Sequence, residues 1–357
     1  MSRKVTELQP WECLMKRIVW KQLGEIQDKK ILDFGSGIGI TANYLAEHND
    51  VTAIEPDEDS IKIRWADNQY TKIVGSTEEL RKFESETFDI IICHNVLEYA
   101  EDREDIVKEF ARILKSNGKI SIVKHNRAGR VMQMVVLLND FEHAHSLLDG
   151  NDGMASKYGA IRYYEDSDIE KWCPELVITK TLGMRTFWDM QQNQEIHKDV
   201  DWQDKMVEIE MRVSDMDGYK DIAFFHHLLF TTYKEKYGFI PTPMEKKLLG
   251  EDVDKIKKIR TIIKYFDEME PKGLRDKKTG EVKLNGKWIA KVMIWAIGEK
   301  AKNKKLFVEY FNEEYKGKYK KLEYASIMAV NLSKEEREQC IIEFENFLNR
   351  KTEEEKQ

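Results

Sequence analysis

A glycine-rich turn followed at a distance by an acidic residue is the pattern in this sequence best suited to bind a nucleotide. Residues 31–39 read ILDFGSGIG, an apolar run that leads into three glycines. Glycines let a backbone turn sharply and approach a ligand that a Cβ would repel. Glu55 ends the next apolar run, 20 residues after Gly35, and a carboxylate there can accept hydrogen bonds from both ribose hydroxyls of an adenosine. The pattern therefore predicts a site for an adenosine-containing cofactor.

Such a site needs parallel strands that alternate with helices, and the chain shows this alternation after a helical lead-in at residues 1–28. Strands are expected at 31–34, 51–55, 72–74, 89–93, 119–124, 176–186 and 223–232. Helices are expected at 39–48, 57–66, 77–82 and 102–114. We predict an α/β fold with a doubly wound, mostly parallel, Rossmann-like sheet. An insertion at about 127–172 is expected to overhang the carboxyl edge of this sheet.

The spacing of the glycines indicates which cofactor is bound. A dinucleotide fingerprint would need a small residue at position 40, where the chain has Ile40, and the pattern is instead GxGxG with Asp33 two residues before its first glycine. This arrangement resembles class I S-adenosylmethionine-dependent methyltransferases. Residues 75–78 (GSTE), 88–99 (FDIIICHNVLEY) and 114–119 (LKSNGK) resemble later segments of that family, in order. The resemblance implies S-adenosyl-L-methionine as cofactor and a pocket formed by Asp33, Gly35, Ser36, Gly37, Glu55, Thr77, Glu78 and His94.

Beyond the fifth strand the sequence resembles a narrower family, the tRNA 5-carboxymethoxyuridine methyltransferases. The similarity spans residues 11–232 and includes 121–132 (SIVKHNRAGRVM) and 182–189 (LGMRTFWD). It implies formation of a methyl ester on the carboxylate of a wobble uridine. That reaction needs little general-base help, because a carboxylate is already ionised at neutral pH.

Three residues are candidates for contact with the methyl acceptor. Arg185 is predicted to clamp a carboxylate, because a guanidinium matches a carboxylate bidentately, and the alternative is an ordinary ion pair with Asp189 or Asp166. Asn126 either orients the acceptor or caps the following helix. His125 stands where the narrower family has tyrosine and either contacts the acceptor or fills space.

Charge is distributed unevenly along the chain, and it leaves the substrate open. Net charge is −7, yet residues 244–357 hold 27 Lys and Arg against 22 Asp and Glu, and 272–321 hold 15 against 6. The segment 147–168 is acidic on balance, which argues against an RNA substrate because RNA binding draws affinity from phosphate neutralisation. Three functions remain: methylation of tRNA, methylation of a small acid or amine, and cofactor binding without catalysis.

Composition and chain organisation limit the class of protein further. Prolines near 237–244 predict a break between a methyltransferase domain at 1–240 and a mainly helical domain at 244–357, which is a candidate for partner or dimer contact. Helices are expected there at 245–266, 287–302, 307–315 and 334–350, with a hairpin near 272–285. No apolar run is long enough to cross a membrane, and no secretion signal is evident. The four cysteines are far apart, so we expect no metal site and a cytoplasmic protein.

Overall fold

The computed structural model describes residues 8–63, 65, 67–155, 159–249, 252–265, 274–284, 286–298, 300–328 and 332–354. The chain divides into two compact units, residues 1–239 and 240–357. Each unit is described by itself.

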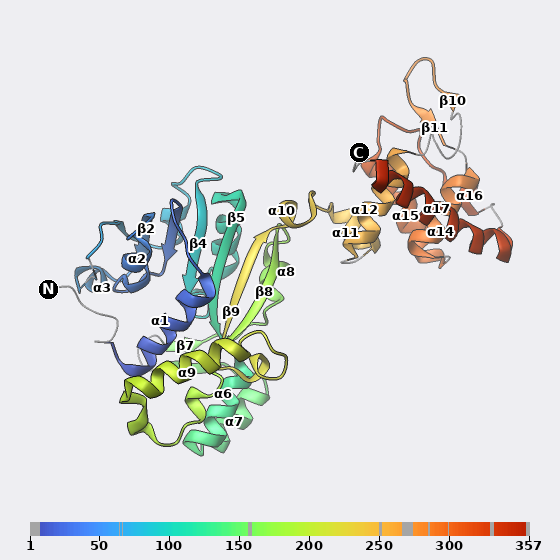
Figure 1. The fold of residues 1–357 in the computed structure, drawn as a ribbon. Coiled ribbons are helices and arrows are strands. Elements are labelled where there is room, and N and C mark those ends of the chain that lie inside the picture. The colour runs from blue at the N-terminus through green and yellow to red at the C-terminus, as the bar shows by residue number, and fades with distance from the viewer. Residues whose placement is uncertain are drawn as a thin grey trace. The chain divides into compact units, whose positions relative to one another are not determined.

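A seven-stranded sheet forms the centre of the first unit (Figure 1), with the strand order β3-β2-β1-β4-β5-β9-β8. Its strands are β1 (Lys30–Phe34), β2 (Asp50–Glu55), β3 (Thr71–Val74), β4 (Phe88–His94), β5 (Leu114–His125), β8 (Leu176–Met184) and β9 (Phe225–Thr232). The first five pair in parallel, and β9 is antiparallel to both β5 and β8. The order reverses between β1 and β4, and such a switch point leaves a crevice at the carboxyl ends of the strands. This is the predicted doubly wound α/β fold.

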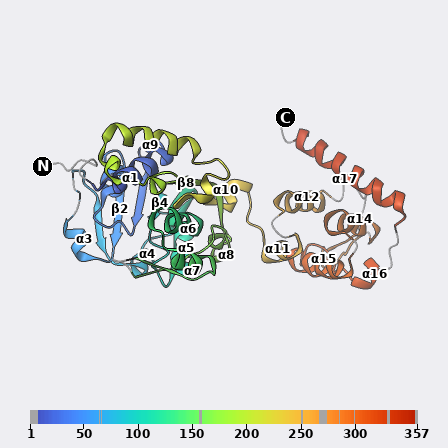
Figure 2. The ribbon, with the colours of Figure 1, turned by 90° about the horizontal axis from the view of Figure 1, so that it is seen from below.

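Alternate residues of the strands enter two different hydrophobic cores, because successive side chains of a strand point to opposite faces. Leu32 of β1 packs with helices α5 and α8, while Ile31 packs with α2. Helices α1 and α9 pack over β5 and β8, on the side of the sheet opposite to α5 (Figure 2). The helices of this layered core are α1 (Pro10–Leu23), α2 (Ile40–Leu45), α3 (Glu58–Ile63), α4 (Thr77–Leu80), α5 (Arg103–Ile113), α8 (Asp168–Trp172), α9 (Val200–Val213) and α10 (Tyr233–Tyr237).

The predicted insertion follows β5 and lies beyond the carboxyl ends of the parallel strands (Figure 1). It contains α6 (Arg127–Gln133), the π-helical turn η2 (Met134–Leu138), α7 (Phe141–Leu148) and the two-stranded ribbon of β6 (Gly153–Ala155) and β7 (Gly159–Ile161). Short 3₁₀ turns follow β8 and precede β9: η3 (Trp188–Met190), η4 (Gln194–Lys198) and η5 (Lys220–Ile222). The insertion thus lies where a ligand at the strand ends would meet it.

The second unit is mainly helical and has a hydrophobic core of its own. Its elements are α11 (Pro243–Leu249), α12 (Val253–Lys264), β10 (Leu274–Arg275), β11 (Val282–Lys283), α14 (Gly286–Ile297), α15 (Ala301–Glu314), α16 (Tyr324–Met328) and α17 (Lys334–Glu354). The start of α17 is capped reciprocally by Ser333 and Glu336, each side chain accepting a hydrogen bond from the other's backbone N–H. The hairpin expected near 272–285 is formed by β10 and β11.

Three helix expectations for this unit were wrong in detail. The helix expected at 307–315 begins at Ala301. The single helix expected at 245–266 is divided into α11 and α12, and Asp252 caps the second of these by accepting from the Lys255 N–H. The helix expected at 287–302 ends at Ile297, where Gly298 adopts a left-handed conformation with φ of +74°. Helical periodicity continues across such breaks, so it did not locate them.

Candidate active site

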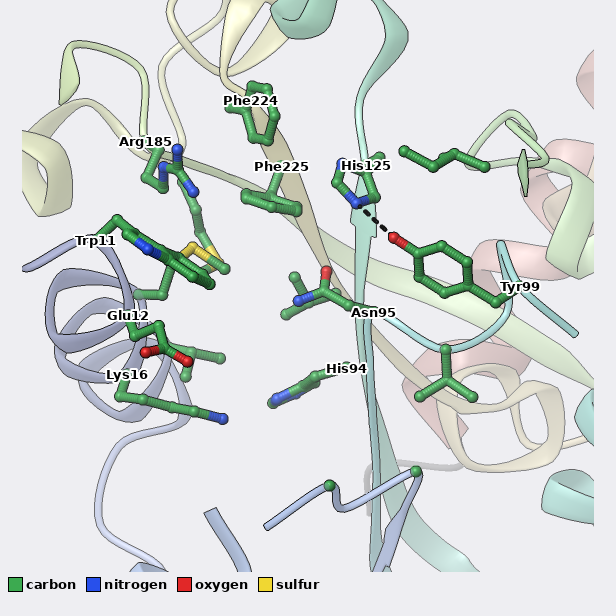
Figure 3. A pocket seen from close by; sticks show the side chains of 18 of the residues that line it. Trp11, Glu12, Lys16, His94, Asn95, Tyr99, His125, Arg185, Phe224 and Phe225 are labelled. Atoms are coloured by element: carbon green, nitrogen blue, oxygen red, sulfur yellow. Dashed lines mark hydrogen bonds between the residues drawn. The ribbon is translucent and has the colours of Figure 1, made fainter. Parts of the chain in front are cut away.

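A cavity of about 780 Å³ opens at the carboxyl ends of β1, β2, β4 and β5 (Figure 3). Its volume suits a ligand of nucleoside size or larger. One end is lined by the glycine turn and the end of β2, and the other by aromatic and cationic side chains from α1, α6, β8 and β9. We call these the cofactor end and the acceptor end.

The glycine turn after β1 forms the floor of the cofactor end. Gly35 has φ of +72°, and a Cβ built there would lie 2.3 Å from Cγ2 of Val96. Gly37 has φ of +56° and lines the cavity with no atom within 4 Å of an added Cβ. Both positions therefore need glycine, the first for space and backbone conformation and the second for conformation alone.

Glu55 ends β2 and faces the cavity, as the sequence predicted. Its Oε2 accepts from the Gly37 N–H at 2.8 Å, and its Oε1 accepts from the Asp57 N–H at 3.0 Å. A carboxylate has about four lone-pair sites, so two remain for a pair of ribose hydroxyls. Backbone donors thus hold this carboxylate in place before any ligand binds.

Asp33 lies beneath the turn and does not line the cavity. It is buried, and its Oδ2 has no hydrogen-bond partner among the described residues. Burial raises the pKa of Asp33 to about 6, against the opposing effect of the nearby Lys16 cation. Lys16 of α1 does line the cavity and donates to Oγ1 of Thr41 at 2.8 Å. The sequence analysis missed Lys16 because it took α1 only as a lead-in helix.

Besides Asp33, three more predicted cofactor residues lie outside the lining of this cavity. Ser36 lies in the glycine loop but is not part of the lining, and Thr77 is buried at the start of α4. Glu78 is exposed, and its carboxylate accepts from the Ser76 N–H at 2.9 Å. His94, in contrast, lines the cavity with Gly35, Gly37 and Glu55. Pro56, Asp57 and Ser60 line it where Thr77 and Glu78 were expected.

Arg185 lines the acceptor end, and its guanidinium forms a bidentate ion pair with Asp189. Both side chains are buried. The guanidinium also lies 4.7 Å from the ring centre of Phe224. Arg185 therefore reaches the predicted place, yet it already has the carboxylate partner that the sequence analysis gave as the alternative.

Arg130 of α6 is a second guanidinium at the acceptor end. It donates to Oε1 of Gln133, and Nε2 of Gln133 donates to Oδ1 of Asp189 at 3.0 Å. Within the described residues Arg130 forms no ion pair with a carboxylate. Arg130 and Arg185 thus share Asp189, Arg185 directly and Arg130 through Gln133.

The two other predicted acceptor residues lie differently. His125 lines the cavity, its ring lies tilted against that of Phe225 with ring centres 4.6 Å apart, and its Nε2 lies 3.3 Å from the Tyr99 hydroxyl. Burial lowers the pKa of His125 to about 3, so the ring is neutral at neutral pH. Asn126 does not line the cavity: its side-chain oxygen caps α6, and its amide donates to the carbonyls of Asp221 and Ala223.

The residues that the sequence analysis missed come mostly from α1 and from the turn before β9. Trp11, Met15 and Lys16 line the cavity from one face of α1, and Phe224 and Phe225 close its acceptor end. The spacing of Met15 and Lys16, four and five residues after Trp11, was visible in the sequence. The sequence alone did not predict that this face of α1 lies opposite the carboxyl ends of β4 and β5.

Comparison with known families agrees with the fold and the cavity. The family model of the methyltransferase domain matches residues 32–122, which contain the glycine turn, Glu55 and His94. These residues form a methyltransferase domain with the class I fold, and S-adenosylmethionine is its cofactor. The residues present fit this cofactor, since the glycine floor and the held Glu55 carboxylate can receive its adenosine part.

The chain is similar to two ubiquinone biosynthesis O-methyltransferases. It is 30% identical to the protein from Bordetella avium over 119 residues, which are 31% of this chain and 49% of that protein. It is 34% identical to the protein from Idiomarina loihiensis over 109 residues, which are 28% of this chain and 43% of that protein. The chain thus spans about half the length of these relatives. A narrower relationship to the tRNA 5-carboxymethoxyuridine methyltransferases is not seen among them.

Two solved structures are similar to the first unit. They are an S-adenosylmethionine-dependent methyltransferase from Mesorhizobium loti (13% identity, TM-score 0.39, 64% of this chain and 99% of that chain) and the PH0226 protein from Pyrococcus horikoshii (12% identity, TM-score 0.43, 64% and 93%). Both scores are low, so the class rests on the domain match and on the site.

Two further findings concern the described residues as a whole. Among them, no helix combines the length and the apolar character needed to cross a bilayer. The part of the chain that the structure describes also holds no group of three or more His, Cys, Asp or Glu side chains placed to bind a metal ion.

Proposed function

We propose that this protein transfers the methyl group of S-adenosylmethionine to an oxygen of an anionic acceptor, with a carboxylate as the favoured group. One observation carries the proposal: a single cavity joins the glycine turn to an aromatic end where two guanidiniums share one carboxylate. An acceptor with one negative charge could pair with Arg130, which forms no ion pair with a carboxylate among the described residues. Charge-assisted hydrogen bonds from a guanidinium suit a carboxylate, which it can bind bidentately.

Each end of the cavity has a distinct task in this reaction. When bound, S-adenosylmethionine supplies an electrophilic methyl group on its sulfonium. Glu55 would accept from the ribose hydroxyls, and Lys16 would bind the carboxylate of the amino-acid part. Arg130 would bind the acceptor anion from the other end, and Phe225 and His125 would exclude water beside it.

The acceptor needs no strong base in this arrangement. His125 lies at the acceptor end, but its pKa of about 3 leaves it unprotonated and weakly basic at neutral pH. A carboxylate is already ionised under those conditions. Catalysis would then rest on holding the acceptor oxygen in line with the methyl group, a contribution that can reach several kcal/mol.

Two sources of such a carboxylate are considered. The ordered similarity of residues 121–132 and 182–189 to the tRNA 5-carboxymethoxyuridine family favours a wobble uridine of tRNA. The acidic segment at 147–168 favours a small molecule, because its residue Ile161 lines the cavity and the acidic charge would repel phosphates. The basic stretch at 272–321 of the second unit would be dispensable for a small acid and needed for tRNA.

Transfer of tritium from labelled S-adenosylmethionine tests the proposal with both sources. The acceptors are bulk tRNA lacking its final wobble methyl group and a panel of small aromatic and aliphatic carboxylic acids. We expect label that mild alkali releases, as it does from a methyl ester. Alkali-stable label would indicate a hydroxyl or amine acceptor and contradict the carboxylate. Cofactor binding by calorimetry without transfer to any acceptor would favour a non-catalytic binding protein.

A further inference from the structure

A chain of hydrogen-bonded side chains extends from the cavity wall into the interior of the first unit. His94 Nε2 lies 2.7 Å from Oγ of Ser121, which lies 2.7 Å from Nε2 of His227. Nδ1 of His227 lies 2.7 Å from Oε1 of Gln22. These residues come from β4, β5, β9 and α1, so the chain crosses three strands and ends on a helix. Ser121 and His227 are buried.

The far end of this chain determines the position of every proton in it. Nε2 of Gln22 donates to the carbonyl of Gly183 at 3.1 Å, so Oε1 of Gln22 must be the acceptor toward His227. His227 therefore carries its proton on Nδ1, and its Nε2 accepts from the Ser121 hydroxyl. The Ser121 oxygen is then free to accept from Nε2–H of His94. Network logic of this kind is the usual way to assign histidine tautomers.

This series of hydrogen-bonded side chains holds protons in place and does not conduct them. A proton arriving at His94 would have to leave through Gln22, and a side-chain amide is not a base that can take it. Burial also lowers the pKa of His94 well below its usual value and that of His227 to about 3, which keeps both rings neutral. The effect of the chain is therefore to lock one tautomer and one ring orientation.

The locked tautomer leaves Nδ1 of His94 as a lone-pair acceptor. His94 lines the cavity, and its Nδ1 has no hydrogen-bond partner among the described residues. Figure 3 shows the His94 ring opposite the side chain of Lys16, across the space between β4 and α1. A cation donor and a neutral acceptor on opposite walls match the two charged groups of an α-amino acid, because Lys16 suits its carboxylate and Nδ1 suits its ammonium.

We propose that Ser121, His227 and Gln22 are positioning residues that hold His94 as a neutral hydrogen-bond acceptor for the amino group of S-adenosylmethionine. The proposal rests on the proposed function for the cofactor, and it adds three residues that touch no ligand. Their task is to prevent His94 from presenting an N–H to an ammonium, which would replace an attraction by a repulsion. Comparable outer partners fix the tautomer of metal-bound histidines.

The tautomer is measured directly by ¹⁵N NMR of the full chain labelled at histidine. His94 is assigned by comparison with His94→Gln. We expect a protonated Nε2 and an unprotonated Nδ1 in the unliganded protein. Ser121→Ala removes both hydrogen bonds of the hydroxyl and is expected to give a mixture of tautomers, whereas Ser121→Thr keeps a hydroxyl and is expected to restore the pattern. A protonated Nδ1 in the unchanged protein would overturn the proposal.

Calorimetric titration with two nucleosides separates positioning from general damage. S-adenosylmethionine carries the amino-acid part, and 5′-methylthioadenosine lacks it. We expect Ser121→Ala to raise the Kd for S-adenosylmethionine about tenfold, the size of one hydrogen bond to a charged group, and to leave the Kd for methylthioadenosine within about twofold. Ser121→Thr is expected to bind both like the unchanged protein. An equal loss for both nucleosides would mean a structural role and contradict the proposal.

A second variant keeps the test informative if Ser121→Ala does not fold. Gln22 is half-buried on α1, so Gln22→Met removes the final acceptor while leaving the sheet intact. We expect the same tautomer mixture and the same selective loss of S-adenosylmethionine. If the unchanged protein binds neither nucleoside, the cofactor function fails, and with it the ligand part of this proposal, whereas the nitrogen shifts still decide whether His94 is locked.

Discussion

At the cofactor end of the cavity most ligand-facing groups come from the ends of neighbouring strands, with Lys16 of α1 as an exception, while at the acceptor end they come from four elements far apart in the sequence. The cofactor end uses backbone conformation at Gly35 and Gly37 and one carboxylate held by N–H groups. The acceptor end uses long side chains, with Arg130 and Arg185 arranged around Asp189. An end built from backbone leaves a local sequence pattern, and an end built from distant side chains does not. The two ends should therefore respond differently to substitution.

The largest effect is expected from Gly35→Ala at the cofactor end. The added Cβ would lie 2.3 Å from Cγ2 of Val96, so the glycine turn and Val96 must move apart, and the left-handed φ of +72° is strained for alanine. We expect S-adenosylmethionine binding to weaken about a thousandfold, or about 4 kcal/mol, by calorimetry. Gly24→Ala is the matched control: Gly24 has φ of +73° but nothing within 4 Å of its Cβ position. Equal losses in both variants would assign the effect to backbone strain and not to the turn.

Substitution of Glu98, which contacts the backbone of His125 at the acceptor end, is expected to change how the stability of the protein depends on pH. Glu98 is buried, its Oε1 accepts from the His125 N–H at 3.3 Å, and burial raises its pKa from 4.5 to about 7. Because the folded pKa is the higher one, stability from this group is complete below about pH 4.5 and is lost as the pH rises through 7. We expect Glu98→Gln to be more stable than the unchanged protein by about 3 kcal/mol at pH 8 and equal to it at pH 4.

Urea unfolding at several pH values measures this difference. A constant difference between the two proteins over the whole range would show that Glu98 has the same pKa in the folded and unfolded states and would remove it as a source of pH dependence.

Glu55→Gln is expected to have the next largest effect. The amide can no longer offer two anionic oxygens to Gly37, Asp57 and a ribose, so binding of S-adenosylmethionine should weaken roughly thirtyfold, or about 2 kcal/mol. Glu58→Gln, a short distance along the chain on exposed α3, serves as the control and should bind normally. Unchanged binding by Glu55→Gln would remove the ribose contact from the site.

Arg130→Met should change the acceptor end alone. We expect the KM for the anionic acceptor to rise about tenfold, with the Kd for S-adenosylmethionine unchanged, because Arg130 would bind the acceptor anion and not the cofactor. Arg127→Met is the control, since Arg127 does not line the cavity and donates to the carbonyls of Leu147 and Asn151. A loss of cofactor affinity in Arg130→Met would mean that the two ends are not separable.

Much of the fold could be predicted from the sequence because its signals are local. The seven strands of the sheet were expected near their observed positions, since short apolar runs bounded by turns mark buried strands. In the second unit, helical periodicity gave the presence of helices but not the breaks at Asp252 and Gly298. An aspartate that caps a helix start or a glycine in the left-handed conformation marks such a break. Aspartate and glycine also occur within continuous helices, so the residue type alone does not locate the break.

The sequence by itself determined the α/β class, and it predicted the glycine turn, Glu55 and His94 as cofactor-site residues, because each of these signals depends on residues close together along the chain. Only the tertiary structure decided that Lys16 faces His94, that Asp189 neutralises Arg185, and that Arg130 remains without a carboxylate of its own among the described residues. It also decided the tautomer of His94, which depends on a glutamine 72 positions away. Charge compensation and proton positions depend on contacts between segments that are distant in the sequence, so local sequence patterns do not predict them.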